Sequence, residues 1–215
     1  MLAKNKLPLL IALILCLESL IYLWAYWTST LDPNNYFAIE SEFIFNKCAR
    51  NSGRVASAIN LVILLMIGYF GLKQIYREDK KRDNLRVLIT LFAVNHLVHF
   101  FFVFQTFKHH TMALNISDNK HGFFTFICIQ LFPIILWTFN NLNKVLFVCI
   151  ILHLFNVSYF IMETFYNKIT PEKPAYHNQF GIAVTTAACI YILYRVLREF
   201  KLNPTVSLNR KNDAK

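Results

Sequence analysis

Residues 86–106 of the chain read RVLITLFAVNHLVHFFFVFQT, an apolar run in which Arg86 alone carries a permanent charge. An α-helix rises about 1.5 Å per residue, so a run of this length crosses the roughly 30 Å hydrocarbon core of a bilayer. Five further runs of the chain have a similar length and character. The sequence therefore predicts a membrane protein built from transmembrane helices.

Six such helices leave little of the 215 residues for a second domain, because six crossings take about 120 residues. We expect an all-α, polytopic six-transmembrane-helix bundle over residues 1–198, followed by a basic tail at 199–215. The protein is then integral to a membrane as a multi-pass protein, with the cell inner or plasma membrane as its expected location. The predicted helices cover residues 7–27, 55–74, 86–106, 122–140, 145–166 and 178–198.

The net charge of +10 is distributed in a way that predicts the orientation of the bundle. In a soluble protein this excess of positive charge would indicate binding to nucleic acid. Here the densest basic segments are residues 77–82 and 195–215, which flank predicted helices. Basic loops stay in the cytoplasm, so we expect the N- and C-termini there, together with Lys4 and Lys6. The lipid bilayer is therefore the expected partner, and nucleic acid is not.

Two segments are expected on the outer side of the membrane. Residues 31–53 are compatible with a short amphipathic helix on the membrane surface and equally with a loop packed over the bundle. Residues 107–121 carry a glycosylation sequon that begins at Asn115. The outer histidines are compatible with solvated side chains or with a surface metal site, and they are His109, His110, His121 and His177.

Four ionisable side chains lie well away from the ends of the predicted helices, where charge is costly and usually marks a cavity, a cofactor or a proton path. At 1.5 Å per residue, His96 lies roughly 15 Å, His153 roughly 12 Å and Glu18 about 16 Å from the inner ends of their helices. His99 lies one turn from His96 on a similar face. Glu18, His96 and His153 are therefore expected near the middle of the bilayer and His99 one turn further out, and these residues meet if their helices are neighbours.

Three kinds of chemistry fit these residues. Two imidazoles from facing helices, His153 and either His96 or His99, are suited to ligate the iron of haem b. Glu18 together with His96 is suited to acid–base catalysis on a lipid or isoprenoid. The same groups are suited to a proton or ion path through the bundle.

A purely structural role is the alternative to all three. Neutral imidazoles in lipid are expected to form hydrogen bonds across helices with an amide (Asn60, Asn95 or Asn156) or with a backbone carbonyl. Glu18 is then expected to be protonated, or bound to a Ser or Tyr hydroxyl. On this hypothesis the protein is a non-catalytic accessory membrane subunit.

The order of several segments resembles that of a known family. Residues 52–56 read SGRVA and open the second predicted helix, residues 85–87 read LRV and open the helix with His96 and His99, and a later helix carries His153. In this order the chain, from about residue 52 to 160, resembles the ferric-reductase-like transmembrane family. Its members are haem-carrying six-helix bundles that include the membrane subunit of a bacterial sulfoxide reductase.

The resemblance implies an integral membrane haem b-binding electron-transfer subunit that works with a separate redox partner protein or quinol. It places His153 opposite His96 or His99 on the iron. That family usually has two histidines on each ligand helix, for two stacked haems, and this chain lacks the second pair. The resemblance therefore implies one haem at most. The other hypothesis is a cofactor-free membrane enzyme or carrier for a lipid-like or isoprenoid-like molecule, which uses Glu18 and the central histidines.

Overall fold

The computed structural model describes residues 4–30, 41–109, 120–170 and 175–201. Within these ranges the chain forms seven α-helices, one short 3-10 turn at Lys4–Lys6 and no strand. Six of these helices are long and apolar enough to cross a membrane, which confirms the predicted all-α, six-helix fold class. The sequon at Asn115 and the tail beyond Lys201 lie outside the described residues.

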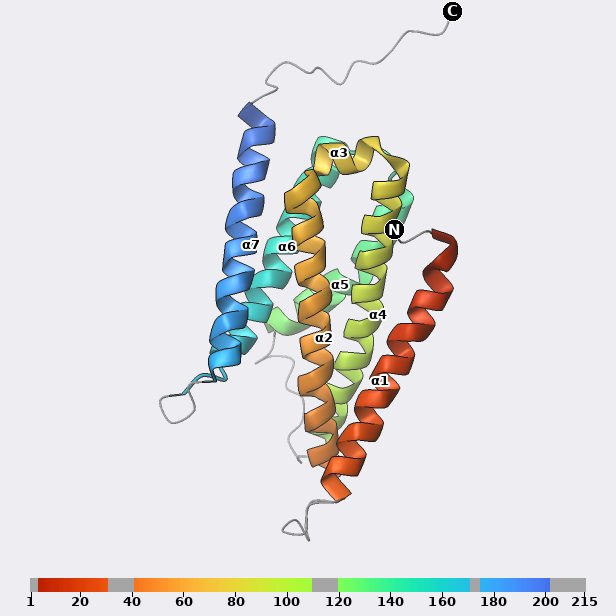
Figure 1. Ribbon diagram of the computed structural model, residues 1–215, viewed down its shortest axis with the longest axis vertical. Coiled ribbons are helices and arrows are strands. Elements are labelled where there is room, and N and C mark those ends of the chain that lie inside the picture. The colour runs from red at the N-terminus through yellow and green to blue at the C-terminus, as the bar shows by residue number, and fades with distance from the viewer. Residues whose placement is uncertain (1–3, 31–40, 110–119, 171–174, 202–215) are drawn as a thin grey trace, which may run out of the picture.

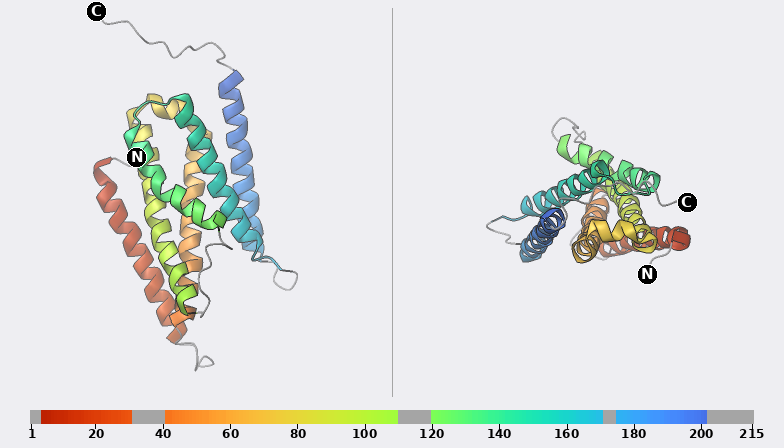
Figure 2. Two further views of the ribbon diagram at one scale, coloured as in Figure 1. Left: turned by 180° about the vertical axis from the view of Figure 1, so that it is seen from behind. Right: turned by 90° about the horizontal axis from the view of Figure 1, so that it is seen from above.

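The helices form an elongated bundle in which α2 contacts α1, α4, α6 and α7 (Figure 1). Helix α1 packs along α2 and α4, and α7 packs along α2 and α6. Helix α5 contacts α4 and α6 and crosses the bundle obliquely (Figure 2). The helices are α1 (Leu7–Thr30), α2 (Ser41–Phe70), α3 (Leu72–Arg77), α4 (Asp79–His109), α5 (Lys120–Thr138), α6 (Lys144–Tyr166) and α7 (Tyr176–Lys201).

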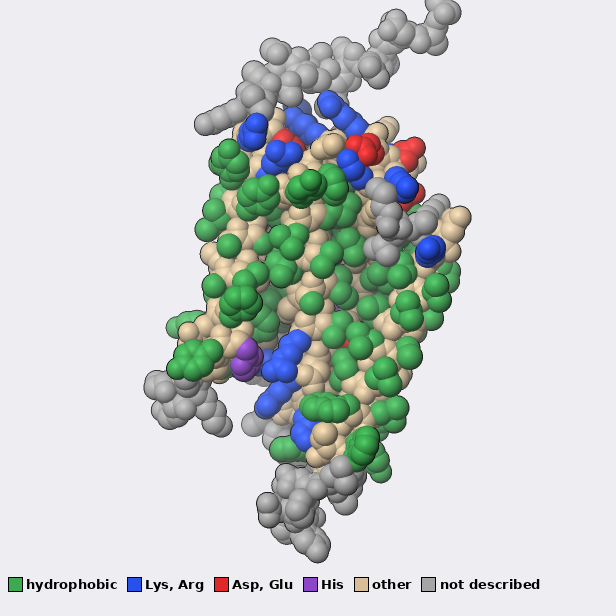
Figure 3. Space-filling view, in the orientation of Figure 1, with side chains coloured by type: hydrophobic (Ala, Val, Ile, Leu, Met, Phe, Trp, Pro, Cys, Tyr) green, Lys and Arg blue, Asp and Glu red, His purple; other side chains and the backbone are tan. Residues whose placement is uncertain are grey.

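One end of the bundle is rich in positive charge. The beginning of α1, the α2–α4 connection, the α5–α6 turn and the last turn of α7 all lie toward this end (Figure 1). Figure 3 shows Lys and Arg side chains gathered there. We call it the basic end, and its residues include Lys73, Arg77, Lys80, Lys81, Arg82, Lys144 and Arg198. By the positive-inside rule this end faces the cytoplasm, and that orientation remains a prediction.

Helix α2 begins earlier than the sequence predicted, at Ser41 in place of residue 55. Ile44 and Cys48 in the added part are buried, and they pack with Ala25 of α1 and Phe102 of α4. These apolar side chains therefore pack between helices. For this segment the sequence had suggested a helix on the membrane surface or a loop over the bundle. The preceding residues lie outside the described part of the chain.

Helix α2 ends at Phe70 because the next residue leaves helical geometry. Gly71 has a φ of 76°, in the left-handed region that glycine adopts most readily. A Cβ at this position would also collide with the carboxylate of Glu199 on α7. The short helix α3 follows, and α4 begins at Asp79, inside the segment 77–82 that was predicted as a loop.

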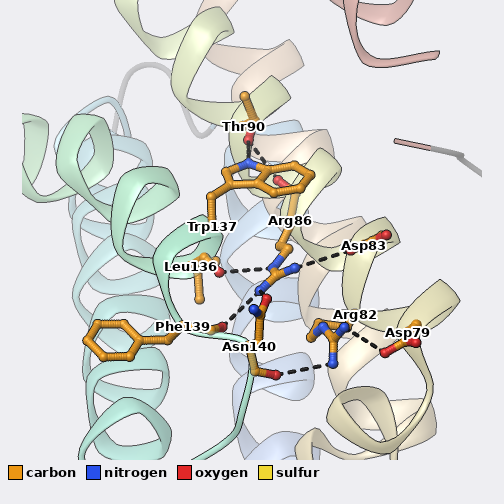
Figure 4. Close-up of polar contacts among 9 residues, drawn as sticks. All are labelled: Asp79, Arg82, Asp83, Arg86, Thr90, Leu136, Trp137, Phe139 and Asn140. Atoms are coloured by element: carbon orange, nitrogen blue, oxygen red, sulfur yellow. Dashed lines mark hydrogen bonds and ion pairs between the residues drawn. The ribbon is translucent and has the colours of Figure 1, made fainter. Parts of the chain in front are cut away.

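Arg86 joins α4 to the end of α5, and it is only 4% exposed although it carries a charge. Figure 4 shows its guanidinium among the carbonyl groups at the C-terminal end of α5. Nε donates to the Leu136 oxygen at 2.9 Å, and Nη2 donates to the Phe139 oxygen at 2.8 Å. Nη2 also donates to Asn140 Oδ1 at 3.0 Å, and Nη1 forms an ion pair at 3.2 Å with Asp83 of α4 itself. The last carbonyls of a helix lack donors within the helix and carry partial negative charge. Arg86 therefore supplies both hydrogen-bond donors and a positive charge to the end of α5.

Replacement of Arg86 by alanine is therefore expected to lower the free energy of unfolding. The loss should be about 1–3 kcal/mol for each buried carbonyl that loses its donor. Thermal unfolding in detergent measures this loss through the Tm. Lys80→Ala is the matched control, because Lys80 is exposed at the same end. Equal Tm values for the two variants would contradict the role given to Arg86.

Candidate functional site

A cavity of about 510 Å³ opens between α2, α4, α5, α6 and the first turn of α7. Its walls include the first half of α2, the end of α6 and the residues that follow it. The cavity therefore lies toward the end of the bundle that is opposite the basic end. We call it the main cavity.

The deep part of the main cavity is apolar. Phe92 of α4, Ile129 of α5 and Val157 of α6 line it, and each is at most 2% exposed. Phe160 and Ile161 of α6 extend the same surface. Walls of this kind suit a hydrocarbon group, which gains dispersion contacts there and leaves no polar group without a partner.

Two of the predicted site residues, His96 and His99, line the main cavity from α4. Their ring centroids are 5.3 Å apart. Gly53 of α2 gives His99 the room that it needs, because a Cβ at Gly53 would lie 3.1 Å from His99 Cε1. The Nδ1 atoms of both rings are buried and have no hydrogen-bond partner among the described residues. The structure therefore places two incompletely paired imidazoles at one cavity wall.

The amides that were considered as partners for these histidines bind elsewhere. Asn60 donates to Ser158 Oγ at 3.5 Å, and Asn95 donates to the Ser52 carbonyl at 3.3 Å. Each of these bonds joins two helices. The ring of His96 packs instead against an aromatic ring of its own helix, Phe92, at a centroid distance of 5.7 Å.

The other two predicted site residues lie outside the lining of the main cavity. The carboxylate of Glu18 is buried and accepts a hydrogen bond from Ser52 Oγ at 2.9 Å, which joins α1 to α2. The ring of His153 stacks on Phe132 of α5, with the centroids 3.9 Å apart. The structure thus brings together the two histidines of α4, but it does not bring Glu18 or His153 into the same cavity.

Three cations that the sequence analysis did not single out line the open part of the main cavity: Arg50 and Arg54 of α2, and Lys168 after α6. Arg50 donates to Asn46 and Arg54 donates to Asn51, both at 3.1 Å. Among the described residues no ion pair joins the three cations to a carboxylate. Figure 3 shows basic side chains over the lower part of α2, close to a histidine beside α7. The sequence signal that could have identified these residues is positive charge on the predicted outer side of the membrane.

The protonation of Lys168 reflects its surroundings. Partial desolvation lowers the pKa of its amine below the usual value, and the positive charges of Arg50 and Arg54 lower it further. Lys168 is nevertheless exposed as a whole residue, so solvent screens part of these effects. An anion bound among the three cations would offset their mutual repulsion.

The outer histidines do not form a shared site in the part of the chain that the structure describes. His121 of α5 contacts Glu163 Oε2 through Nδ1 and Asn156 Oδ1 through Nε2, both at 3.2 Å. These contacts join α5 to α6, and His177 lines the main cavity. Across the described residues no group of three or more His, Cys, Asp or Glu side chains could hold a metal ion. His110 lies outside these residues.

Comparison with known proteins identifies no relative: no protein-family model, no curated protein and no solved structure matches the chain. The resemblance to ferric-reductase-like proteins therefore stays a prediction. Function must be inferred from the cavity and its residues.

The lowered pKa of Lys168 predicts that its amine reacts faster with an acylating reagent at mildly alkaline pH, because a larger share of the amine is neutral. Brief acetylation in detergent followed by peptide mass spectrometry measures the rate, with the exposed Lys144 as the reference. The double variant Arg50→Gln, Arg54→Gln removes two positive charges, so it should raise the pKa and slow the labelling of Lys168. Unchanged labelling of Lys168 in the double variant would contradict the electrostatic coupling.

Proposed function

We propose that this protein binds a lipid-like amphiphile in the main cavity, as a membrane-bound carrier or enzyme. One observation supports the proposal, namely the change in character along the cavity wall. Buried Phe92, Ile129 and Val157 line the deep part, and polar and cationic side chains line the open part. An amphiphile has the same division between an apolar body and a polar end. Ligand sites are typically concave and mostly apolar, with a few polar groups that orient the ligand.

His96 and His99 are the side chains through which the cavity would act on a bound molecule. A neutral imidazole offers one donor and one acceptor, and each of these rings has a nitrogen without a protein partner among the described residues. In a carrier, these rings would form hydrogen bonds with a polar group of the ligand. In an enzyme, they would move a proton.

Glu18 has a different part in this proposal from the acid–base role considered in the sequence analysis. Its carboxylate is 2% exposed and is bound to Ser52 on α2. Helix α1 has few other buried side chains, because most of its large apolar residues are exposed. We therefore propose that Glu18 holds α1 against the bundle and does not contact the ligand.

A bulky side chain in the main cavity should exclude the ligand. Thr164 lines the cavity, and its hydroxyl donates only within its own helix, to the Phe160 carbonyl at 2.8 Å. Thr164→Trp is expected to reduce the lipid that co-purifies with the protein, measured by extraction and mass spectrometry.

Thr138→Trp is the matched control for this experiment. Thr138 makes the same kind of bond, to the Ile134 carbonyl at 2.9 Å, but it is exposed on α5 and does not line the main cavity. The control should keep the lipid content of the parent protein. Equal lipid content in both variants, or no bound lipid in the parent, would overturn the proposal.

The resemblance to ferric-reductase-like proteins supports a second proposal, a haem b-binding electron-transfer subunit. His96 and His99 lie on one face of one helix, so they cannot bind an iron from opposite sides. The second axial ligand would have to be His153, which stacks on Phe132 outside the cavity lining. A bis-histidine haem would therefore require the ring of His153 to leave Phe132 and turn toward the main cavity.

The visible absorption spectrum distinguishes the two proposals. Protein produced with haem supplied and purified in detergent is measured oxidised and then reduced with dithionite. A Soret band that shifts on reduction, and that His153→Ala abolishes, would support the haem proposal. The lipid proposal predicts that the protein lacks this band and still carries lipid. A colourless parent protein would remove the haem proposal.

A further inference from the structure

A second hollow adjoins the main cavity. It has a volume of about 250 Å³ and lies between α2 and α7, where Ala58, Leu61, Phe180 and Val184 line it. We call it the α2–α7 groove. Apart from its polar margin, its walls are apolar, as in the deep part of the main cavity. The bundle therefore offers two apolar spaces.

The two spaces meet at a shared set of residues, most of them polar. Five residues line both: Arg54, Ser57, Phe165, His177 and Asn178. Arg54 thus lies where the main cavity and the α2–α7 groove join. A ligand whose polar group sits beside Arg54 can extend one apolar chain into each space.

The shared margin lies at the depth of lipid headgroups. Arg50 and Phe70 are separated along α2 by about 30 Å at a rise of 1.5 Å per residue, which equals the thickness of the hydrocarbon core. Phe70 is at the basic end, where α2 stops. Arg50 and Arg54 therefore lie close to the opposite surface of the bilayer, and this position suits contact with a headgroup.

The charge at this margin selects for an anion. Arg50, Arg54 and Lys168 line the main cavity, and among the described residues none forms an ion pair with a carboxylate. Guanidinium groups bind phosphate through two parallel hydrogen bonds, and an ammonium group adds a further charge. A zwitterionic headgroup would instead bring a quaternary ammonium group close to three cations, which is unfavourable.

We propose that the ligand is an anionic phospholipid with two acyl chains. Its phosphate lies among Arg50, Arg54 and Lys168, one chain occupies the main cavity, and the other occupies the α2–α7 groove. This inference rests on the proposed function, and it narrows the ligand from any amphiphile to one lipid class. Single-chain lipids fill one of the two spaces and therefore bind more weakly.

The headgroup is tested with detergent-purified protein titrated with phosphatidylglycerol or phosphatidylcholine of identical chains, with binding followed by native mass spectrometry. We expect phosphatidylglycerol to bind at least about tenfold more tightly than phosphatidylcholine. Both lipids offer a phosphate for charge-assisted hydrogen bonds, but the three cations repel the quaternary ammonium group of phosphatidylcholine. The double variant Arg54→Gln, Lys168→Gln should remove this preference. The control is Lys80→Gln, Arg198→Gln at the basic end, which should keep it.

The two chains are tested by filling the α2–α7 groove alone. Ala58→Trp should weaken phosphatidylglycerol to the affinity of lysophosphatidylglycerol, which has one chain, and leave the lysolipid unchanged. Undiminished lysolipid binding also shows that the variant is folded. Val62→Trp is the control, because Val62 lies one turn away on α2, is 49% exposed and lines neither space. Equal effects of the two substitutions would overturn the two-chain assignment.

The outcomes separate this inference from the proposed function. Equal affinities for phosphatidylglycerol and phosphatidylcholine would overturn the anionic headgroup but leave lipid binding in place. Inorganic phosphate that displaces the lipid at comparable concentration would identify a free anion as the ligand and overturn the inference. Absence of binding by every lipid would overturn the proposed function and this inference together.

Discussion

Close packing of α2 against α4 is the constraint on which the rest of the bundle depends. Gly53 lets the ring of His99 approach α2 so closely that a Cβ would lie 3.1 Å from it. At the preceding position, Ser52 accepts a hydrogen bond from Asn95 through its carbonyl and donates one to Glu18 through its hydroxyl. Ser52, Asn95 and Glu18 are buried between helices, so the partners of their polar groups must come from neighbouring helices. This contact therefore sets the relative positions of α1, α2 and α4, and the main cavity adjoins it.

The two ends of the bundle use arginine in opposite ways. At the basic end Arg86 is buried, and its donors are taken up by the last carbonyls of α5 and by Asp83. At the other end Arg50 and Arg54 donate to amides of their own helix and form no ion pair with a carboxylate among the described residues. A guanidinium with satisfied donors holds structure together, whereas one with spare donors at the margin of a cavity is available to a ligand. The same residue type therefore has a structural role at one end and a proposed binding role at the other.

Much of the fold could be predicted from the sequence, and part of the candidate site could be. The six apolar helices follow from hydropathy, and His96 and His99 could be recognised because an ionisable group within a transmembrane helix is unusual. Arg50 and Lys168 could not be recognised in the same way, because they lie just outside the ends of the predicted helices 55–74 and 145–166, where charge is ordinary and indicates orientation. The helical extension from Ser41 was also missed, since its apolar side chains suit a surface helix as well as an interhelical contact.

The sequence by itself determined that the chain crosses a membrane with six helices, because the length of each apolar run must match the thickness of the hydrocarbon core. It also showed which ionisable side chains lie far from the ends of the apolar runs. Only the tertiary structure decided what these side chains contact on other helices: His96 and His99 line the main cavity, His153 stacks on Phe132, and Glu18 accepts a hydrogen bond from Ser52. The physical reason is that all these helices are similarly apolar, so hydropathy does not distinguish their neighbours. Their arrangement depends on close packing and on individual polar bonds between residues that are far apart in the sequence.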